Sequence, residues 1–291
     1  MDQIDAVIAR QTWRTLEPIH GMIYFAPEAE AAYATLGITG RSGYFASRSA
    51  AMGAVDPEVV LATFFNFHPD LVRGAMTGVW EVATPAAVVA ARFAAVDRAL
   101  RRAGGDLLDT QELPTAAGLA RRAAEAAAEH GEGRPLFSGH ASLDWPDEPH
   151  LALWHAQTLL REFRGDGHIA ALVLAGLSGL DALVLHAATG EVPRSALQAT
   201  RAWSDDEWAG AVDSLAARGL VDAHGEFTER GREARDAIEL QTDRLAAAPY
   251  AALGADDCAT LRRLARPLSK AIVATGTLAF AARPFAEPPP A

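Results

Sequence analysis

The chain contains a single cysteine, Cys258, in 291 residues. One thiol cannot form an internal disulfide, and metal sites built from several thiolates are excluded as well. Motifs that cradle phosphates or present a serine nucleophile are also missing, because the sequence has no GxGxxG, no P-loop and no GxSxG. The sequence therefore names no cofactor and no reaction.

Basic residues and long hydrophobic runs are scarce too. The 26 lysines and arginines stand against 37 aspartates and glutamates, and the net charge of −11 repels phosphate backbones on average. The apolar run 169–184 contains Ser178 and Asp181, so it predicts a buried core helix rather than a membrane span. The polar, amphipathic opening MDQIDAVIARQTW is not typical of a signal peptide. We expect a soluble cytoplasmic protein with no membrane partner.

What the chain has in abundance is alanine and leucine. Half of its residues are hydrophobic and only 7% are aromatic, which favours tightly packed helices. Prolines in Asp56-Pro57 and Thr84-Pro85 mark helix starts, whereas Pro18 should kink or split a helix over 2–25. Glycine, proline and charge gather between 104 and 149 and predict a boundary. We predict four parts: an N-terminal helical half (1–104), a connector (105–149), a C-terminal half (150–253), and a C-terminal helix with a disordered tail (254–291).

The stretch 194–235 has the order of a winged helix. A helix is followed by a turn in which Ser204 is the N-cap and Glu207 its capping-box partner. The next helix ends before Gly219, and two short strands around His224 and a long helix follow. The phrase LAARGLVDAHGEFTERGR resembles the MarR-like form of this plan. The pattern predicts a helix-turn-helix with a small two-stranded wing near 220–228.

An internal repeat relates the two halves. At an offset of 136 residues, NFHPDLVRGAM aligns with AWSDDEWAGAV, and Phe67 pairs with Trp203 and Gly74 with Gly210. The expected fold is therefore mainly α: a tandem pseudo-repeat of helical, winged-helix-like halves in which one chain imitates a dimer. The first copy lacks a wing, because VWEVATP is too short for a hairpin with an extended tip. The oligomeric state stays open.

Four blocks together resemble a known family: LEPIHGMIYFAPEA, TFFNFHPDLV, LWHAQTLLREFRGDGHIAAL and RAWSDDEWAGAV. Their combination is similar to a group of uncharacterised actinobacterial proteins that contain a helix-turn-helix domain. The resemblance extends roughly from Arg10 to Leu253. It implies a fold and brings no established activity with it.

The second helix of the predicted helix-turn-helix is acidic. A recognition helix should offer arginine, lysine, asparagine or glutamine to bases and phosphates. This one has Asp205, Asp206, Glu207 and Asp213, with Arg218 as its only cation. The composition favours a packing module over an operator reader, so we do not expect DNA as a partner. A MarR-like DNA-binding transcriptional regulator is the alternative function.

Ionisable residues cluster within the most hydrophobic stretch, 151–190, where burial is costly unless charges are paired. With polar residues of the first half they form the candidate site. His20 and His168 are the candidate acid–base residues, because histidine titrates near neutrality. The candidate ligand-binding residues are Glu17, Tyr24, Arg48, Trp154, His155, Arg161, Arg164, Asp166 and His186.

These residues predict a small-molecule-binding protein whose ligand is apolar with an anionic group, held by Arg161 and Arg164. Catalysis in specialised metabolism is an open extension, and no metal site is expected. A buried polar network that only ties helices together explains the same residues. The two readings differ in one respect, since a ligand site requires a cavity of about 300 Å³ or more, whereas a structural network leaves none.

Overall fold

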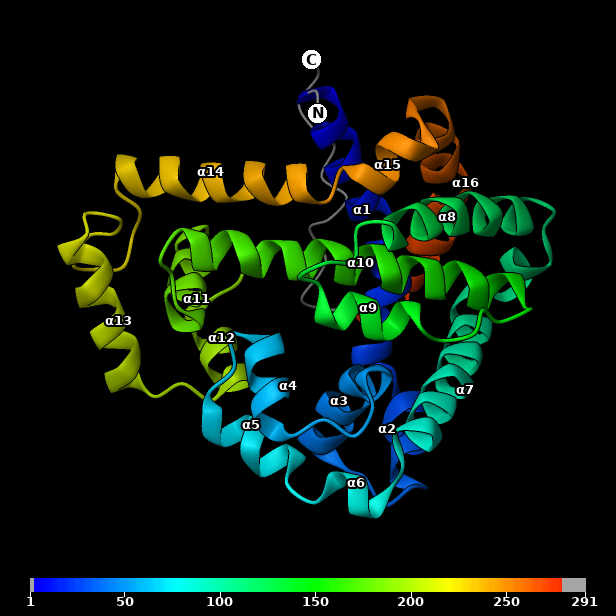
Figure 1. Ribbon diagram of the computed structural model, residues 1–291, viewed down its shortest axis with the longest axis horizontal. Helices are drawn as coiled ribbons and strands as arrows, with labels where there is room; N and C mark the ends of the chain where they lie inside the picture. Colours follow the sequence, from blue (N-terminus) through cyan, green and yellow to red (C-terminus); the bar gives the residue numbers. More distant parts are fainter. Residues whose placement is uncertain (1–2, 279–291) are drawn as a thin grey trace.

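Helices form the regular structure of residues 3–278, which are the residues that the computed structural model describes (Figure 1). The α-helices are α1 (Gln3–Gly21), α2 (Pro27–Ala34), α3 (Gly40–Ser49), α4 (Pro57–Phe64), α5 (Pro69–Met76), α6 (Val79–Val82), α7 (Pro85–Gly104), α8 (Glu112–Ala128), α9 (Pro135–Ala141), α10 (Pro149–Leu174), α11 (Gly179–Ala188), α12 (Arg194–Arg201), α13 (Asp205–Ala217), α14 (Glu229–Leu245), α15 (Ala248–Leu253) and α16 (Ala255–Ala274). Three short 3-10 helices are η1 (Met22–Tyr24), η2 (Ala50–Met52) and η3 (Gly105–Asp109). The mainly α prediction is confirmed.

Local sequence signals explain where many helices begin. Six of them start at a proline, whose fixed φ and missing N–H suit the first helical position. The capping box of Ser204 and Glu207 forms as predicted, with the Ser204 side chain accepting from the Glu207 N–H. Pro18 does not split α1, because it lies in the last turn of the helix, which ends at Gly21.

Two hydrophobic cores divide the buried residues. The first contains side chains from α1 to α9, the first half of α10, and α15 and α16. The second contains the end of α10 from Ala171 together with α11, α12, α13 and α14. Helix α10 runs through the middle of the molecule and contributes to both cores, and α14 lies alongside it (Figure 1). The helix-turn-helix of the second half is thus joined to the first core through α10 and through α14, which packs against α1 and leads into α15.

The stretch 105–149 contains helices α8 and α9. The alanine face of α8 is buried in the first core, where α8 packs against α10. Helix α16 returns to α1, where the Ser269 hydroxyl donates to the carbonyl oxygen of Thr15 at 2.7 Å. The division of the chain into four parts stays a prediction. The tail beyond 278 lies outside the described residues.

The two-stranded wing near 220–228 is not formed. Within residues 3–278 a single antiparallel bridge joins Val221 and Phe227. The Asp222 carboxylate accepts from the N–H groups of His224 and Glu226, at 2.8 and 3.0 Å. A local side-chain turn therefore takes the backbone donors that a longer strand ladder would need.

No single helix of residues 3–278 is long and apolar enough to cross a membrane. Two pairs of consecutive helices reach that length and hydropathy only when their helices are joined, and each pair is sharply bent.

Candidate functional site

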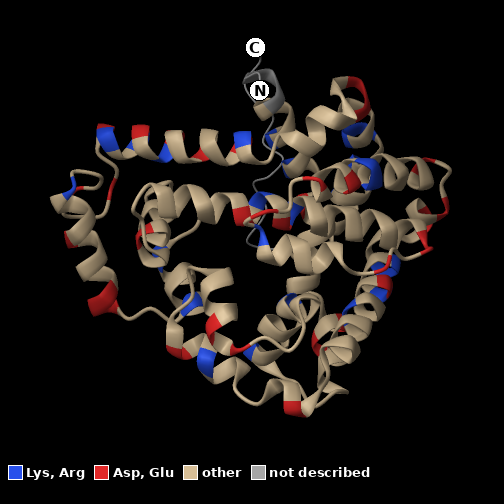
Figure 2. Cartoon of the chain, in the orientation of Figure 1, with Lys and Arg blue, Asp and Glu red and all other residues tan. Residues whose placement is uncertain are grey.

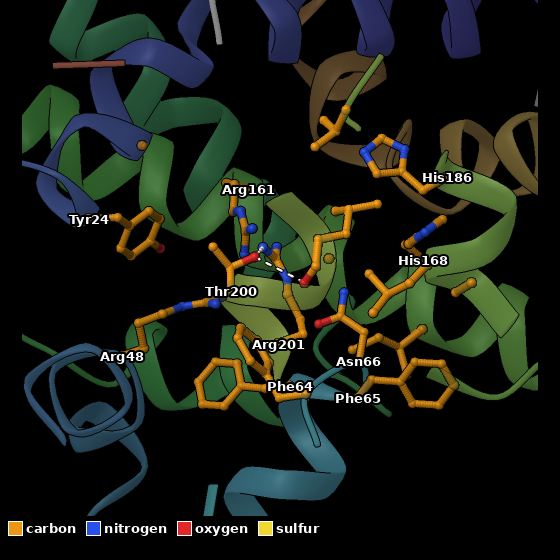
Figure 3. A pocket seen from close by; sticks show the side chains of 18 of the residues that line it. Tyr24, Arg48, Phe64, Phe65, Asn66, Arg161, His168, His186, Thr200 and Arg201 are labelled. Carbon is orange, nitrogen blue, oxygen red and sulfur yellow. Dashed lines mark hydrogen bonds between the residues drawn. The ribbon is translucent and has the colours of Figure 1, made fainter. Parts of the chain in front are cut away.

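A cavity of about 680 Å³ lies between the two cores. Its walls come from α1, α3, α4 and the α4–α5 turn on one side, and from α10, α11, α12 and α14 on the other. Figure 3 shows Tyr24 and Arg48 at one end, His168 and His186 at the other, and Arg201 between them. This volume is larger than the roughly 300 Å³ at which ligand sites begin, whereas a solid polar network would leave no cavity.

Two facing turns form one wall. The backbone N–H of His68 donates to the Arg201 carbonyl oxygen, and the indole N–H of Trp203 donates to the Asn66 carbonyl oxygen, both at 2.9 Å. Glu207 accepts from the His68 ring at 3.0 Å. Each turn joins two helices of a helix-turn-helix-like unit, α4 to α5 and α12 to α13. The two units therefore meet at their turns, beside the cavity.

Each of these turns contains a non-glycine residue with positive φ. Phe65 has a φ of 57° and Ala202 a φ of 64°, and they are the two non-glycine residues of positive φ in the described chain. Such backbone costs about 1–3 kcal/mol and persists only where the surroundings impose it. Here the surroundings include close backbone packing, because a Cβ on Gly179 would lie 2.0 Å from the Phe65 carbonyl oxygen.

A buried ion cluster forms the end of the cavity near Tyr24. Glu162 is 1% exposed and accepts from Arg48 at 3.1 and 3.3 Å and from Arg161 at 2.7 Å. Burial raises the pKa of Glu162, but the two guanidiniums outweigh it and hold the pKa below its usual range. Glu17, also on the wall, has a raised pKa because of its burial, although Arg161 lies 3.8 Å away.

Arg201 has no such partner. Its Nη1 donates to the Thr200 hydroxyl at 2.6 Å, and its guanidinium lies 5.2 Å from the centroid of the Phe67 ring. No carboxylate of the described residues pairs with it, and its buried Nε atom has no hydrogen-bond partner there. Burial lowers the pKa of Arg201. The middle of the cavity thus contains a guanidinium that pairs with no carboxylate of residues 3–278.

Tyr24 connects the cavity to a buried histidine. Its hydroxyl lies 2.6 Å from Nε2 of His20, whose Nδ1 is 3.0 Å from the Thr158 hydroxyl. His20 is fully buried and stacks on Trp154. Burial and then Arg161 lower its pKa well below the usual value, so the ring is neutral.

The opposite end contains His168 and His186, and Asp166 of α10 also lines the cavity. Nδ1 of His168 lies 2.9 Å from the Thr242 hydroxyl, which itself donates to the Ile238 carbonyl oxygen. Burial lowers the pKa of His168 to about 4 and also lowers that of His186. Burial raises the pKa of Asp166 to about 6, although its carboxylate accepts from the Phe137 N–H at 2.9 Å.

The structure brings most of the predicted site residues to this cavity. Seven of them line it: Glu17, Tyr24, Arg48, Arg161, Asp166, His168 and His186. They come from α1, η1 and α3 on one side and from α10 and α11 on the other. Whether any of them binds a ligand stays a prediction.

Four predicted residues do not line the cavity. His20 and Trp154 lie behind Tyr24. His155 is 1% exposed between Phe93 and Trp145, and its two ring nitrogens have no partner among the described residues.

Arg164 is the fourth residue outside the cavity, and its charge is already paired. It donates to Asp243 at 2.7 Å and to Glu239 at 3.3 Å, and its guanidinium lies over the Trp13 ring. Arg164 therefore ties α10 to α14 and α1. The anion-binding pair of Arg161 and Arg164 does not face one ligand position.

Sequence reasoning missed several polar residues of the wall, among them Tyr44, Asn66, Glu162 and Arg201. Glu162 was visible as the carboxylate between Arg161 and Arg164, and its neighbours could have marked it as their counter-ion. Arg201 sits at the end of α12, where only the contact between the two turns directs it into the cavity. Among residues 3–278 no cluster of three histidine, cysteine or acidic side chains could hold a metal ion.

The comparisons with known proteins identify a family. A model described as a helix-turn-helix family matches residues 9–279, which is most of the chain. No curated protein and no solved structure shows significant similarity to it.

This match corrects our expectation that DNA is not a partner, because helix-turn-helix folds are of the DNA-binding type. The acidity of α13 misled us. Its carboxylates gather at the end that follows α12 (Figure 2). There Glu207 caps the helix and bonds His68, and Asp205 pairs with Arg194 at 2.7 Å. Asp205 and Glu207 thus have a local role at the start of α13, so the acidity of this helix does not by itself exclude DNA.

Proposed function

This chain belongs to the helix-turn-helix family, and we propose that it binds a small apolar molecule with an anionic group in the cavity between its two cores. The single observation behind the proposal is Arg201, a partly buried guanidinium that faces the cavity without a carboxylate partner among the described residues. An unpaired charge is costly to bury, and a bound anion removes that cost.

The surroundings of Arg201 support an anion rather than a neutral ligand. Arg41 and Arg48 act on Arg201 as like charges. Within the part of the chain that the structure describes, Arg48 pairs with the Glu162 carboxylate, and Arg41 and Arg201 pair with none. The cavity is therefore a local positive site in a protein of net charge −11. Phenylalanine, leucine and isoleucine side chains make up much of the remaining wall and suit an apolar body.

Calorimetry with straight-chain carboxylates and the alcohols of equal length tests the proposal. We expect a carboxylate such as decanoate to bind and decanol to bind more weakly. Arg201→Met keeps the aliphatic stem and removes the charge, and it should weaken decanoate binding by roughly 10–100-fold, the value of a hydrogen bond to a charged group. Arg73→Met, at an exposed ion pair with Glu58, is the matched control. Equal affinities of both variants, or no binding by wild type, would refute the assigned role.

We propose further that the internal repeat is a duplication and that the cavity lies between its two copies. The helices α3, α4 and α5 follow one another as α11, α12 and α13 do, with similar lengths for α4 and α12. Their turns contain the two positive-φ residues Phe65 and Ala202 and exchange hydrogen bonds in both directions. The bridge of Val221 and Phe227 is in the place of a wing and supports a reduced MarR-like second copy.

DNA binding is the second candidate function, and family membership favours it. Exposed cations follow the position of the wing at Arg230 and Arg232, at the start of α14. Fluorescence anisotropy with duplex DNA at about 50 mM salt, where electrostatic attraction is strong, tests this. We expect Arg230→Ala with Arg232→Ala to weaken binding more than Arg121→Ala, a change on α8 in the other core. Absence of binding by wild type would exclude this candidate.

A further inference from the structure

The direction of the hydrogen bonds behind Tyr24 follows from the groups involved. The Thr158 hydroxyl lies 3.0 Å from the Trp154 carbonyl oxygen, which can only accept, so the single hydroxyl proton is given to it. Thr158 must then accept from Nδ1–H of His20, at 3.0 Å. Because the buried His20 ring is neutral, its one proton is on Nδ1 and its Nε2 atom is an acceptor.

Tyr24 therefore donates its own proton to His20, at 2.6 Å. Burial raises the pKa of Tyr24, so the phenol is protonated and has one proton, which is directed away from the cavity. The oxygen of Tyr24 presents only lone pairs to the cavity that this side chain lines. His20 does not line the cavity and is a positioning residue: by accepting the Tyr24 proton, it leaves the Tyr24 oxygen as an acceptor towards the cavity.

The Tyr44 hydroxyl has the opposite hydrogen-bonding role, because its proton can be donated to a ligand. Its hydroxyl oxygen accepts from Arg48 at 2.9 Å, and no acceptor among residues 3–278 takes its proton. Burial raises its pKa, but Arg48, Arg161 and Arg201 outweigh burial and lower the pKa, which strengthens the phenol as a donor. The rings of Tyr24 and Tyr44 lie 5.5 Å apart, centroid to centroid.

We propose that these two tyrosines recognise a hydroxyl group on the ligand, which donates to Tyr24 and accepts from Tyr44. A hydroxyl has one proton and free lone pairs, so it satisfies both phenols at once. An ether or a ketone can only accept and leaves Tyr24 without a donor. This inference rests on the proposed carboxylate site at Arg201, and together they define the ligand class as a hydroxy acid with an apolar body.

The histidine tautomer can be measured without any ligand. The ¹⁵N chemical shifts of His20, assigned by comparison with His20→Gln, should show a neutral ring protonated on Nδ1 from pH 5 to 8. A ring protonated on Nε2 would place a second proton at Tyr24 and would overturn the inference, whatever the protein binds.

The ligand class is tested with ω-hydroxy carboxylates of six to twelve carbons and their ω-methoxy and unsubstituted analogues. The length series lets one member span the distance from Arg201 to the tyrosines. For wild type we expect the best hydroxy acid to bind about fivefold more tightly than its methoxy analogue, which corresponds to one neutral hydrogen bond.

Four variants separate the groups. Tyr24→Phe should abolish the preference for hydroxy over methoxy, whereas Tyr44→Phe should weaken both ligands. Tyr33→Phe, a buried tyrosine of α2 outside the cavity wall, should change neither. His168→Phe removes an acceptor at the far end of the cavity. If this variant, and not Tyr24→Phe, abolishes the preference, the assignment to Tyr24 is wrong.

The two proposals fail in different ways. Equal binding of hydroxy and methoxy acids at every length overturns the hydroxyl inference, while binding that depends on Arg201 still supports the carboxylate site. Failure of every carboxylate to bind overturns the proposed function and this inference with it.

Discussion

Glu162→Gln should be among the most destabilising single changes in this protein. The side chain is 1% exposed, and its two carboxylate oxygens accept from Arg48 and Arg161 at 2.7–3.3 Å. Glutamine keeps the shape and removes the charge, which leaves two guanidiniums uncompensated in the wall of the cavity. Breaking a buried ion pair from one side costs about 3–5 kcal/mol.

That cost is large against a total stability of about 5–15 kcal/mol for a natural protein. At about 2–4 °C per kcal/mol for a chain of this size class, the midpoint of thermal unfolding should fall by roughly 10 °C. Circular dichroism against temperature and against urea measures the change.

Glu58→Gln is the matched control, because Glu58 accepts from Arg73 at 2.7 Å with the same chemistry and has a side chain that is 62% exposed. Solvent screens this pair, so the midpoint should hardly move. If Glu162→Gln unfolds within about 2 °C of Glu58→Gln, burial does not govern the strength of the cluster and the reasoning is refuted.

Gly179→Ala should destabilise the contact between α11 and the α4–α5 turn by about 1–3 kcal/mol, because the new Cβ would lie 2.0 Å from the Phe65 carbonyl oxygen. Gly210→Ala has open space in α13 and should be neutral or stabilising, so equal urea midpoints for the two variants would contradict the packing seen here. Three buried histidines have a pKa lowered by burial, to about 3 or 4: His140, His155 and His168. A depressed folded pKa contributes stability that is present above the unfolded value of 6.5 and is lost as the pH falls, whereas Asp166, raised to about 6, acts in the opposite direction. Unfolding at pH 5.5 should therefore take up at least about two protons, which calorimetry in buffers of different ionisation enthalpy measures; zero uptake would show that these rings are not neutral in the folded protein.

The starts and ends of the helices were predictable because the residues that determine them are close in sequence. Proline at a first helical position, the capping box of Ser204 and Glu207, and the C′ glycine Gly219 with φ of 70° act within a few residues. They specified the α12–α13 turn and the start of α13 from sequence alone. The wing prediction failed because a side-chain turn at Asp222 competes with strand pairing, and residue patterns do not rank two local options of similar energy.

The candidate site was predictable as a set of residues and not as an arrangement. Buried charges within a hydrophobic stretch pointed to α10, and helix periodicity placed Arg161, Arg164 and His168 near one another. In the structure Arg161 pairs with Glu162 of its own helix and lies 3.8 Å from Glu17 of α1, whereas Arg164 pairs with Asp243 of α14. A sequence pattern states which faces are polar, whereas the neighbour that meets each face depends on the whole chain.

The sequence by itself determined that the chain is helical, where many of its helices begin, and which turn separates α12 from α13. Each of these follows from backbone propensity and capping over a few residues. Only the tertiary structure decided that the turn at Asn66 meets the turn at Trp203, and that Arg201 faces the cavity with no ion-pair partner among residues 3–278. Contacts across more than 130 residues depend on how two cores pack, and no local pattern encodes that choice.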